Sequence, residues 1–533
     1  MTRVEQEDER AAEGRAMRWL LGGAIGLLSA ASAVAVGEVA AALAAEFGAA
    51  APSAPVVAVG EWAIALSPPW LKEAAIRQFG THDKTALLTG VYATILAVSA
   101  LAGILARKHL SWATLLASGF GVTGLVAAAT RPSAGFGGYF PALLAGGAAV
   151  LVLRGLTVYS QNPDLRGPEP DPVERRKFLA ALGGTVVACL VGGVGGQTWL
   201  DSRYNATSAR AAVKLPVPTE TLPALPASVH PNVPGLEPFF TPNVAQGGFS
   251  GFYRVDTALS IPQVDPEKWM LRIHGMVDRP FEISFDDLLR MPLEEHDLTL
   301  TCVSNPVGGS YCGNARWLGT QLAPLLRRAG VQSGADQILS TSIDGMTIGT
   351  PVEAVLDGRQ SMLAVAMNGE VLPIEHGFPA RMLVPGLYGY VSATKWVVDL
   401  ELTTFAQASA YWVTNGWSQQ GPVKTASRID VPGNGSTVNQ GTVTLAGVAW
   451  ATHRGVDAVE VRIDSGPWTP ATLATSDTPD TWRMWSHAWP AERGNHTVTV
   501  RCTDGTGTLQ TPVVQDVIPN GASGYHSISV SVV

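Results

Sequence analysis

Residues 298–325 read LTLTCVSNPVGGSYCGNARWLGTQLAPL and join a strand pattern to a glycine-rich loop and a helical pattern. Leu298, Leu300 and Cys302 alternate with threonines, as the residues of a half-buried strand do. A short amphipathic helix is expected around Leu322. A cysteine at the end of a strand, held by a tight loop, suits a thiolate that is presented to a ligand. On this pattern alone a packed core cysteine is the commoner outcome, because free cysteine is among the most buried residue types.

Two motifs extend this stretch. The first runs Cys-x-x-Asn from Cys302, crosses the glycine-rich gap and ends in Ala-Arg-Trp-x-Gly-x-x-Leu at residues 315–322. The second reads MNGEVLPIEHGFPAR at residues 367–381 and continues through a Val-Pro-Gly to a Lys-Trp pair. Two long motifs in this order form a far stronger signal than one short pattern. Together they resemble the molybdenum-ligand and cofactor-phosphate segments of the sulfite oxidase family of molybdopterin enzymes, over roughly residues 235–515.

The resemblance implies a molybdenum–molybdopterin cofactor, with the thiolate of Cys302 as the ligand to the metal. A soft, charged sulfur suits a high-valent metal because it donates electron density. The resemblance also places His376 and Arg381 at the pterin phosphate, where a planar guanidinium matches the phosphate geometry. The further cofactor contacts implied in the same way are Asp344, Ala393, Thr394 and Lys395. Cys312 is expected to be a packed residue that lies close enough in sequence to approach Cys302.

Upstream, the sequence FYRVD ends at Asp256 and resembles the family segment whose arginine faces the substrate and whose neighbours hold the pterin. Tyr253 is therefore expected at the cofactor, and Arg254 is expected to bind a substrate anion and to act in catalysis. Asp256 stands where that segment has a histidine. The family's active-site tyrosine has no clean match, since Ser409 aligns best and Tyr411 lies two residues on. These departures concern the substrate rather than the cofactor.

A membrane portion is expected, because 46% of the residues are hydrophobic and only 15% are charged. Apolar runs of spanning length lie at about 18–38, 84–105, 109–129, 137–157 and 178–198. The run from Val56 to Leu66 is too short to span and carries Glu61. Five spans place the basic loops on the same side as the N-terminus, which fits the tendency of positive charge to stay in the cytoplasm. Residues 39–83 are then external.

The sequence Arg175-Arg-Lys-Phe-Leu179 directly precedes the last apolar run. It is either a twin-arginine export signal inside the chain or the ordinary basic anchor of a span. The resemblance favours the signal, because molybdopterin enzymes must take up their cofactor and fold before export. Both alternatives place the chain after about residue 200 outside the cytoplasm, and both describe a multi-pass protein of the plasma membrane.

The expected fold class is multi-domain. Residues 1–200 are expected to form an α-helical membrane domain, 201–242 a proline-rich linker or arm, and 243–425 an α+β molybdopterin domain. Over 426–533, short alternating strands with inward residues such as Val459 predict an immunoglobulin-like β-sandwich. The family's C-terminal domain of this type often dimerises, so a homodimer is expected. Within the α+β segment, strands are expected at 269–273, 298–302, 381–384 and 397–402, and helices at 285–290 and 318–329.

The expected activity is oxygen-atom transfer outside the cytoplasm by a membrane-anchored enzyme, as in sulfite oxidases, on a small oxyanion or sulfur compound. A sulfoxide or N-oxide reductase on the same fold and a non-catalytic cell-surface binding protein are the alternatives. The net charge of −8 argues against a nucleic-acid partner. No haem is expected, because the membrane half offers only His82 and His109 as ligands and the chain has no haem-attachment motif. Electrons are therefore expected to pass to or from a separate protein or a quinone.

Overall fold

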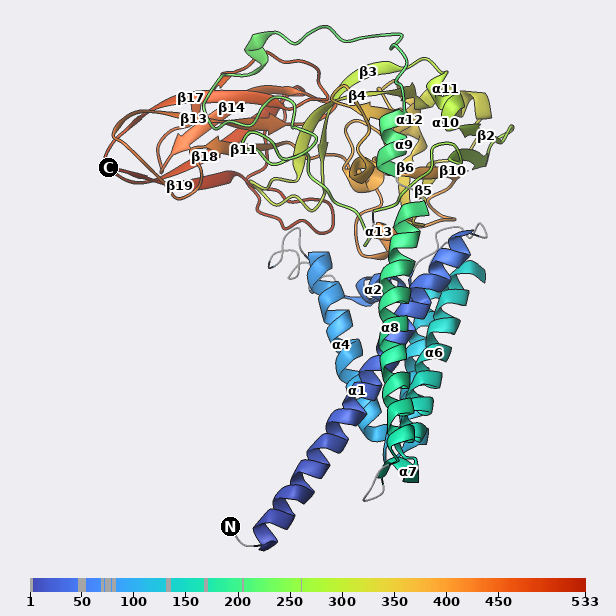
Figure 1. The fold of residues 1–533 in the computed structure, drawn as a ribbon. Helices are drawn as coiled ribbons and strands as arrows, with labels where there is room; N and C mark the ends of the chain where they lie inside the picture. Colours follow the sequence, from blue (N-terminus) through green and yellow to red (C-terminus); the bar gives the residue numbers. More distant parts are fainter. Residues whose placement is uncertain are drawn as a thin grey trace. The chain divides into compact units, whose positions relative to one another are not determined.

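The structure is a computed structural model and describes residues 3–46, 54–68, 71, 78, 83–130, 136–166, 171–203, 206–259 and 261–533. The chain divides into two compact units, one formed by residues 1–205 with 257–261 and the other by the remaining residues. Figure 1 shows that the first unit is helical and that the second is rich in strands. His82, which the haem argument used, lies outside the described residues.

In its described residues the helical unit contains long apolar helices and two shorter helices, of 12 and 4 residues. They are α1 (Arg3–Glu46), α2 (Pro55–Leu66), α4 (Asp83–Ala106), α5 (Leu110–Ala129), α6 (Phe136–Ser160), α7 (Pro163–Arg166) and α8 (Pro172–Arg203). Five stretches are long and apolar enough to cross a membrane, at residues 17–44, 85–106, 110–129, 138–160 and 172–196. They coincide with the five expected runs, while the apolar helix at residues 55–64 is shorter. Helix α1 lies against α4, α6 and α8 (Figure 1). The helices are thus compatible with five membrane spans.

Two five-stranded sheets form the α+β part of the second unit. One has the order β2-β1-β10-β5-β6, from β1 (Met270–Gly275), β2 (Phe281–Ser284), β5 (Gln337–Ser342), β6 (Thr347–Pro351) and β10 (Val397–Thr403). The other has the order β3-β4-β7-β8 with β9 beside β7, from β3 (Glu294–Thr301), β4 (Cys312–Gln321), β7 (Met362–Met367), β8 (Glu370–Val371) and β9 (Arg381–Leu383). The short helices are α9 (Ala206–Ala212), α10 (Phe285–Leu289), α11 (Leu322–Ala329), α12 (Val352–Leu356) and α13 (Tyr411–Thr414).

Strand β4 corrects one expectation. Residues 318–321, expected to start a helix, continue the strand, and α11 begins only at Leu322. The reason is that β4 pairs with β3 on one side and β7 on the other, so its backbone groups are satisfied by the ladder in a buried position. Gly319 permits this approach, because a Cβ at that position would collide with the carbonyl oxygen of Leu363 in β7. The sequence pattern predicted helix α11 but not the pairing of β4 with β3 and β7, which extends the strand to Gln321.

The proline-rich segment before the sheets lies along strands β3 and β4 as an ordered arm. The amide of Thr219 donates to the carbonyl of Leu293 at 2.8 Å, and the amide of Thr241 donates to the carbonyl of Asn314 at 2.8 Å. Arg316 of β4 donates to the carbonyl of Pro223 at 3.3 Å. The arm therefore satisfies backbone groups on the domain that follows it rather than acting as a free spacer.

The C-terminal part is a two-sheet sandwich. One sheet has the order β11-β13-β17-β16, from β11 (Ala426–Val431), β13 (Gly441–Trp450), β16 (Thr472–Leu473) and β17 (Arg483–Ala491). The other has the order β12-β19-β18-β14-β15, from β12 (Ser436–Val438), β14 (Val456–Ile463), β15 (Thr469–Pro470), β18 (Gly494–Asp504) and β19 (His526–Val532). Val459, Val461, Trp485 and Cys502 are buried in one core cluster between the sheets. Alternation along each strand places these residues inward.

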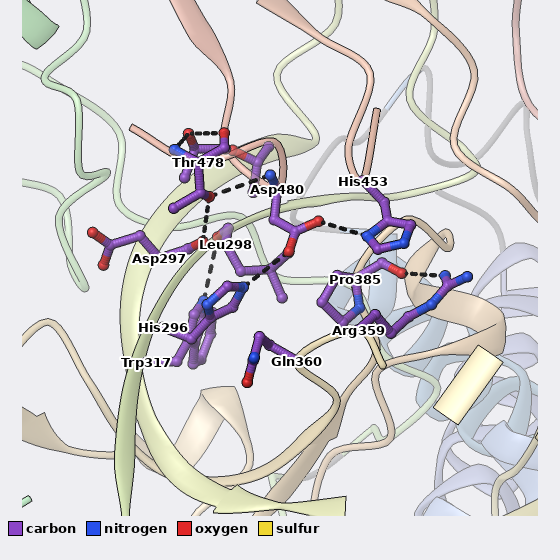
Figure 2. A network of polar contacts seen from close by, with 12 residues as sticks. His296, Asp297, Leu298, Trp317, Arg359, Gln360, Pro385, His453, Thr478 and Asp480 are labelled. Atoms are coloured by element: carbon purple, nitrogen blue, oxygen red, sulfur yellow. Dashed lines mark hydrogen bonds and ion pairs between the residues drawn. The ribbon is translucent and has the colours of Figure 1, made fainter. Parts of the chain in front are cut away.

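Asp480, in the loop before β17, joins this sandwich to strand β3 of the α+β domain. Its Oδ2 lies 3.0 Å from His296 Nε2 and its Oδ1 lies 3.3 Å from His453 Nδ1. Figure 2 shows the carboxylate between the two imidazoles. Burial raises the pKa of Asp480, but the hydrogen bonds from the two histidines outweigh it and lower the pKa to about 2. The carboxylate is therefore ionised at neutral pH and holds the two domains together.

Candidate active site

Cys302 directly follows β3 and is fixed by the loop that returns to β4. Its amide donates to the carbonyl of Tyr311 at 2.9 Å, and its carbonyl accepts from the amide of Asn305 at 3.0 Å. The side chain of Asn305 closes the loop by accepting from the amide of Tyr311 at 2.8 Å. The Cys302 side chain is buried, and burial raises the pKa of its thiol. A bound metal cation would favour the thiolate instead.

Cys312 lies on the neighbouring strand. It stands opposite Thr301 in the ladder, and its Sγ is 3.4 Å from the Thr301 hydroxyl. Burial raises the pKa of Cys312 to about 12, and both this thiol and that of Cys302 are free. Cys312 is therefore a packed neighbour of the candidate ligand, as the sequence suggested.

Aromatic rings cover the space beside Cys302. Tyr253 is stacked on Phe252 with ring centroids 5.3 Å apart, and Phe252 meets the ring edges of Trp317 and His376 at 5.7 Å and 5.6 Å. Burial raises the pKa of Tyr253 well above its ordinary value, and the neighbouring thiols of Cys302 and Cys312 raise it further. The Tyr253 hydroxyl therefore keeps its proton. These rings exclude water from one side of the site.

Arg381 opens β9 and is a buried cation without a buried anion. Its guanidinium donates to the carbonyls of His376 at 3.1 Å and Ala393 at 3.4 Å and lies 5.1 Å from the centre of the Trp317 ring. Its Nε has no partner, and no carboxylate pairs with it among the residues that the structure describes. Burial lowers the pKa of Arg381 to about 10. Leaving a buried charge uncompensated is costly, and an anion bound beside Arg381 would compensate that charge.

Lys395 and Arg254 share one carboxylate. Lys395 Nζ lies 2.6 Å from Asp256 Oδ2, and Arg254 Nε donates to the same oxygen at 2.8 Å. Lys395 also donates to the carbonyl of Glu375 at 3.1 Å. Burial lowers the pKa of Lys395 to about 8, although Asp256 opposes this effect. Asp256 is only 3% exposed, whereas Arg254 is 36% exposed.

His376 is neutral in this cluster of positive charges. Burial lowers the pKa of His376 to about 3, and the charges of Arg381 and Lys395 lower it further. Its Nε2 lies 3.4 Å from the carbonyl oxygen of Asn243. The structure thus brings Cys302, Tyr253, Arg254, His376, Arg381 and Lys395 to one region of the α+β domain.

Comparisons with known proteins relate two segments of the chain to described families. The family described as an oxidoreductase molybdopterin binding domain matches residues 258–412, and a bacterial Ig domain matches residues 426–500. "Uncharacterized oxidoreductase YuiH" of Bacillus subtilis (strain 168) is 34% identical over 157 residues, which are 30% of this chain and 76% of that protein. "Sulfite oxidase, mitochondrial" of Homo sapiens is 28% identical over 295 residues. The chain belongs to the sulfite oxidase family of molybdopterin-dependent oxidoreductases.

Membership of the sulfite oxidase family confirms the expected enzyme class and the expected fold class. The matched region is 46% of this chain and 53% of human sulfite oxidase, so the chain spans about half the length of that relative. A solved structure, the sulfane dehydrogenase SoxCD from Paracoccus pantotrophus, covers 57% of this chain and 83% of its own at 23% identity and a TM-score of 0.49.

The remaining candidates from the sulfite oxidase motifs lie around the same region. Thr394 Oγ1 is 2.6 Å from Ser340 Oγ, so this side chain is already bonded to β5. Ala393 contributes its carbonyl to Arg381. Asp344 accepts from the amide of Met346 at 3.3 Å in the turn between β5 and β6, which ties its side chain to its own turn. We therefore keep Asp344 as a prediction from the family motif.

Ser409 and Tyr411, the two positions considered for the active-site tyrosine, lie beside strand β6. Tyr411 begins α13, and its amide donates to the hydroxyl of Thr347 at 3.1 Å. Burial raises the pKa of Tyr411 above its ordinary value. Nothing in these contacts assigns it to the cofactor.

Arg428 is a positioning residue that the sequence did not reveal. It lies in β11 of the immunoglobulin-like domain, yet it donates to the carbonyl of Gly309 in the Cys302 loop at 3.0 Å. It also binds Glu237 of the arm at 2.8 Å. The ring of His526 packs against Gly308 of the same loop, where a Cβ would collide with it. Contacts between segments this far apart leave no local signal in one sequence.

Proposed function

We propose that this chain is a membrane-anchored, molybdopterin-dependent enzyme that transfers one oxygen atom to or from a small substrate outside the cytoplasm. The observation that carries the proposal is Arg381, a fully buried guanidinium that has no carboxylate partner in the described part of the chain and lies in the same cluster as Cys302. A phosphate group matches Arg381 in charge and geometry, because the guanidinium fork binds phosphate through paired hydrogen bonds.

The residues present fit a molybdopterin group. Cys302 would bind the metal through its thiolate, while Arg381 and Lys395 would hold the phosphate. When bound, the cofactor would supply a metal centre that exchanges an oxygen atom and two electrons with the substrate. Thr394, whose side chain is bonded to β5, would contribute backbone groups only.

The chain's own groups set the conditions for this chemistry. Tyr253 keeps its phenolic proton beside Cys302, so it can donate a hydrogen bond without acting as a base at neutral pH. His376 is neutral and therefore adds no charge to the site. Phe252 and Trp317 close the apolar side, which keeps water away and strengthens the electrostatic contacts within. Arg254 is the half-exposed cation of the site and is placed to meet a substrate.

The domain limits given above, at residues 200, 242 and 425, belong to the proposal, and so does the membrane topology. Five apolar helices and the basic loops between them support a cytoplasmic N-terminus and an external catalytic domain. Arg175 and Arg176 lie in the first turns of α8, as a signal or a basic anchor would. Electrons would pass to or from a separate protein or a quinone. A homodimer formed through the immunoglobulin-like domain is part of the same proposal.

The cofactor is tested by elemental analysis of the full chain purified from membranes. We expect about one molybdenum atom per chain, and loss of metal or activity in Cys302→Ser, because an alkoxide-forming hydroxyl is a poor substitute for a soft thiolate. Cys189→Ser is the matched control, since this thiol lies in α8 and contacts the hydroxyl of Ser32 at 3.2 Å. Exported wild-type protein without molybdenum would overturn the proposed function.

The topology is tested separately by fusing reporters after Val533. A reporter that is active only in the cytoplasm should be silent, and one that is active only outside should give a signal. Changing Arg175 and Arg176 together to Lys distinguishes the two sequence alternatives. Normal export of that variant would identify the pair as a basic anchor and leave the five spans unchanged.

A further inference from the structure

The charges around the substrate side of the site would balance once a phosphate dianion is bound. Among the described residues of this cluster, Arg254, Lys395 and Arg381 are cations and Asp256 is the carboxylate in contact with two of them. His376 adds no charge, because its pKa is about 3. The sum is two positive charges. A phosphate dianion held by Arg381 and Lys395 would cancel both of them.

Asp256 is responsible for this balance. Its carboxylate is 3% exposed and accepts from Lys395 Nζ at 2.6 Å and Arg254 Nε at 2.8 Å. The Arg254 fork is therefore partly used, with its Nε side turned to Asp256 and a second, longer contact of 3.5 Å from Nη2. An incoming anion would meet a guanidinium that already has a counter-ion. It would also lie near a buried carboxylate that repels it.

We propose that Asp256 is a specificity-determining residue that makes the site select an uncharged oxygen compound, of the sulfoxide or N-oxide class, over an oxyanion such as sulfite. This inference rests on the proposed function and names the substrate class of the same site. An uncharged S=O or N–O group needs one hydrogen-bond donor and no surplus charge, and Arg254 supplies that donor from its exposed edge.

The reaction balances with an external electron donor. A dialkyl sulfoxide takes up two electrons and two protons, its S=O bond breaks, and the dialkyl sulfide and one water molecule leave. In the assay, two molecules of a reduced viologen dye each supply one electron, and solvent supplies the protons. A reduced quinone or protein of similar class would supply the electrons in the membrane.

The test compares an anion with a neutral substrate in the molybdenum-loaded full chain. Wild-type protein should reduce dimethyl sulfoxide with a higher kcat/KM than it oxidises sulfite with ferricyanide. Asp256→Asn removes the repelling charge and keeps the shape, so it should shift the ratio toward sulfite by roughly tenfold. Asp256→Glu keeps the carboxylate and should shift the ratio far less. Asp399→Asn is the matched control, because Asp399 pairs with Arg272 and His274 elsewhere on β10.

A binding measurement gives a readout that does not depend on turnover. Calorimetry at fixed ionic strength should show sulfate, an unreactive dianion, binding to Asp256→Asn roughly tenfold more tightly than to wild type. Part of the gain should be lost in the double variant Arg254→Gln with Asp256→Asn, because Arg254 is one of the two cations that the loss of the carboxylate releases, Lys395 being the other.

Two results would overturn the inference. One is a loaded wild-type enzyme that prefers sulfite to the neutral sulfoxide. The other is an Asp256→Asn protein whose sulfate affinity and substrate ratio equal those of wild type. If a variant fails to fold, the ratio of the two kcat/KM values in the wild type, for dimethyl sulfoxide and for sulfite, decides the question. Protein without molybdenum would instead overturn the proposed function, so the two failures are distinguishable.

Discussion

The regions around Arg381 and Arg428 each contain a buried guanidinium group, but only the one at Arg428 is paired with carboxylates. Both arginines are buried, each at 5% exposure. Arg428 binds two carboxylates, Asp430 at 2.5 Å and Glu237 at 2.8 Å; burial lowers its pKa, but the carboxylates outweigh this and raise the pKa above its ordinary value. Arg381 has no such partner in the described chain, and its pKa falls to about 10. The buried cation with its counter-ions stabilises contacts within the fold, whereas under the proposed function the one without them binds the phosphate of the cofactor.

Replacing Arg381 should reduce cofactor binding while leaving the stability of the fold nearly unchanged. In Arg381→Met the molybdenum retained after purification should fall below about a tenth of the wild-type level, since charge-assisted hydrogen bonds to the phosphate are lost. The free energy of unfolding of the cofactor-free chain should change by no more than about 1 kcal/mol, because the variant also removes an unpaired buried charge. Metal analysis and urea unfolding measure the two effects. Full metal loading of this variant would refute the assignment.

Replacing Arg428 should have the opposite profile. Arg428→Met leaves Glu237 and Asp430 without their cation, so the free energy of unfolding should fall by about 3 kcal/mol. Urea unfolding of the full chain in detergent, followed by tryptophan fluorescence, measures this change. Arg428→Lys keeps the charge but not the fork and should lose less. A change below about 1 kcal/mol in the methionine variant would show that the carboxylates find other partners.

Asp480 extends the comparison to a histidine–carboxylate junction. The pKa of Asp480 is about 2 in the folded chain, below the ordinary aspartate value, so the ionised form stabilises the fold. That contribution is present above about pH 4 and is lost as the pH falls through 2, and its size is about 2 kcal/mol. Asp480→Asn should therefore remove this part of the acid sensitivity of unfolding. Identical pH profiles for the variant and the wild type would contradict the role given to Asp480.

The smallest effect concerns Lys395, whose pKa of about 8 is below the ordinary lysine value because of burial. The ammonium form binds anions, and with a pKa of about 8 its population falls about tenfold between pH 7 and pH 9, so sulfate affinity of the cofactor-free chain should weaken by up to about tenfold. Lys395→Met should bind sulfate more weakly and show no such change. Calorimetry at constant ionic strength measures both, and an unchanged slope in the variant would assign the titration to another group.

The two family motifs could be located because the residues of each are close in sequence. Cys302 ends a strand whose alternation is visible, and His376 and Arg381 lie in one continuous motif. The ion pair of Lys395 with Asp256 was not predictable, because the two residues are 139 positions apart in the sequence. The same holds for Arg428, which reaches Gly309 across 119 positions. One sequence shows which residues are present but not which distant ones pair.

Elements followed the same rule. The five apolar helices were predictable from length and composition, because each satisfies its own backbone. The end of β4 was not, because residues 318–321 carry a pattern that suits a helix, and the strand depends on the pairing of β3 and β7 with it. A sequence pattern is therefore enough to predict a helix, whose backbone hydrogen bonds are local, but not the end of a strand, whose hydrogen bonds are to other strands.

The contacts of Arg428 with Gly309 and of His526 with Gly308 set the order in which the Cys302 loop gains its neighbours during synthesis. His526 lies in β19 and accepts from the amide of Ile429 at 3.0 Å while its ring packs on Gly308. A nascent chain has made the cysteine and its loop long before β19 leaves the ribosome. Until that strand joins the sandwich, the loop lacks the contact of His526 with Gly308 and is held on this side through Arg428 and the carbonyl of Gly309. The loop that carries the thiol thus gains its contact with His526 only after β19 has been translated, so under the proposed function Cys302 would be set for a metal only once the immunoglobulin-like domain has folded.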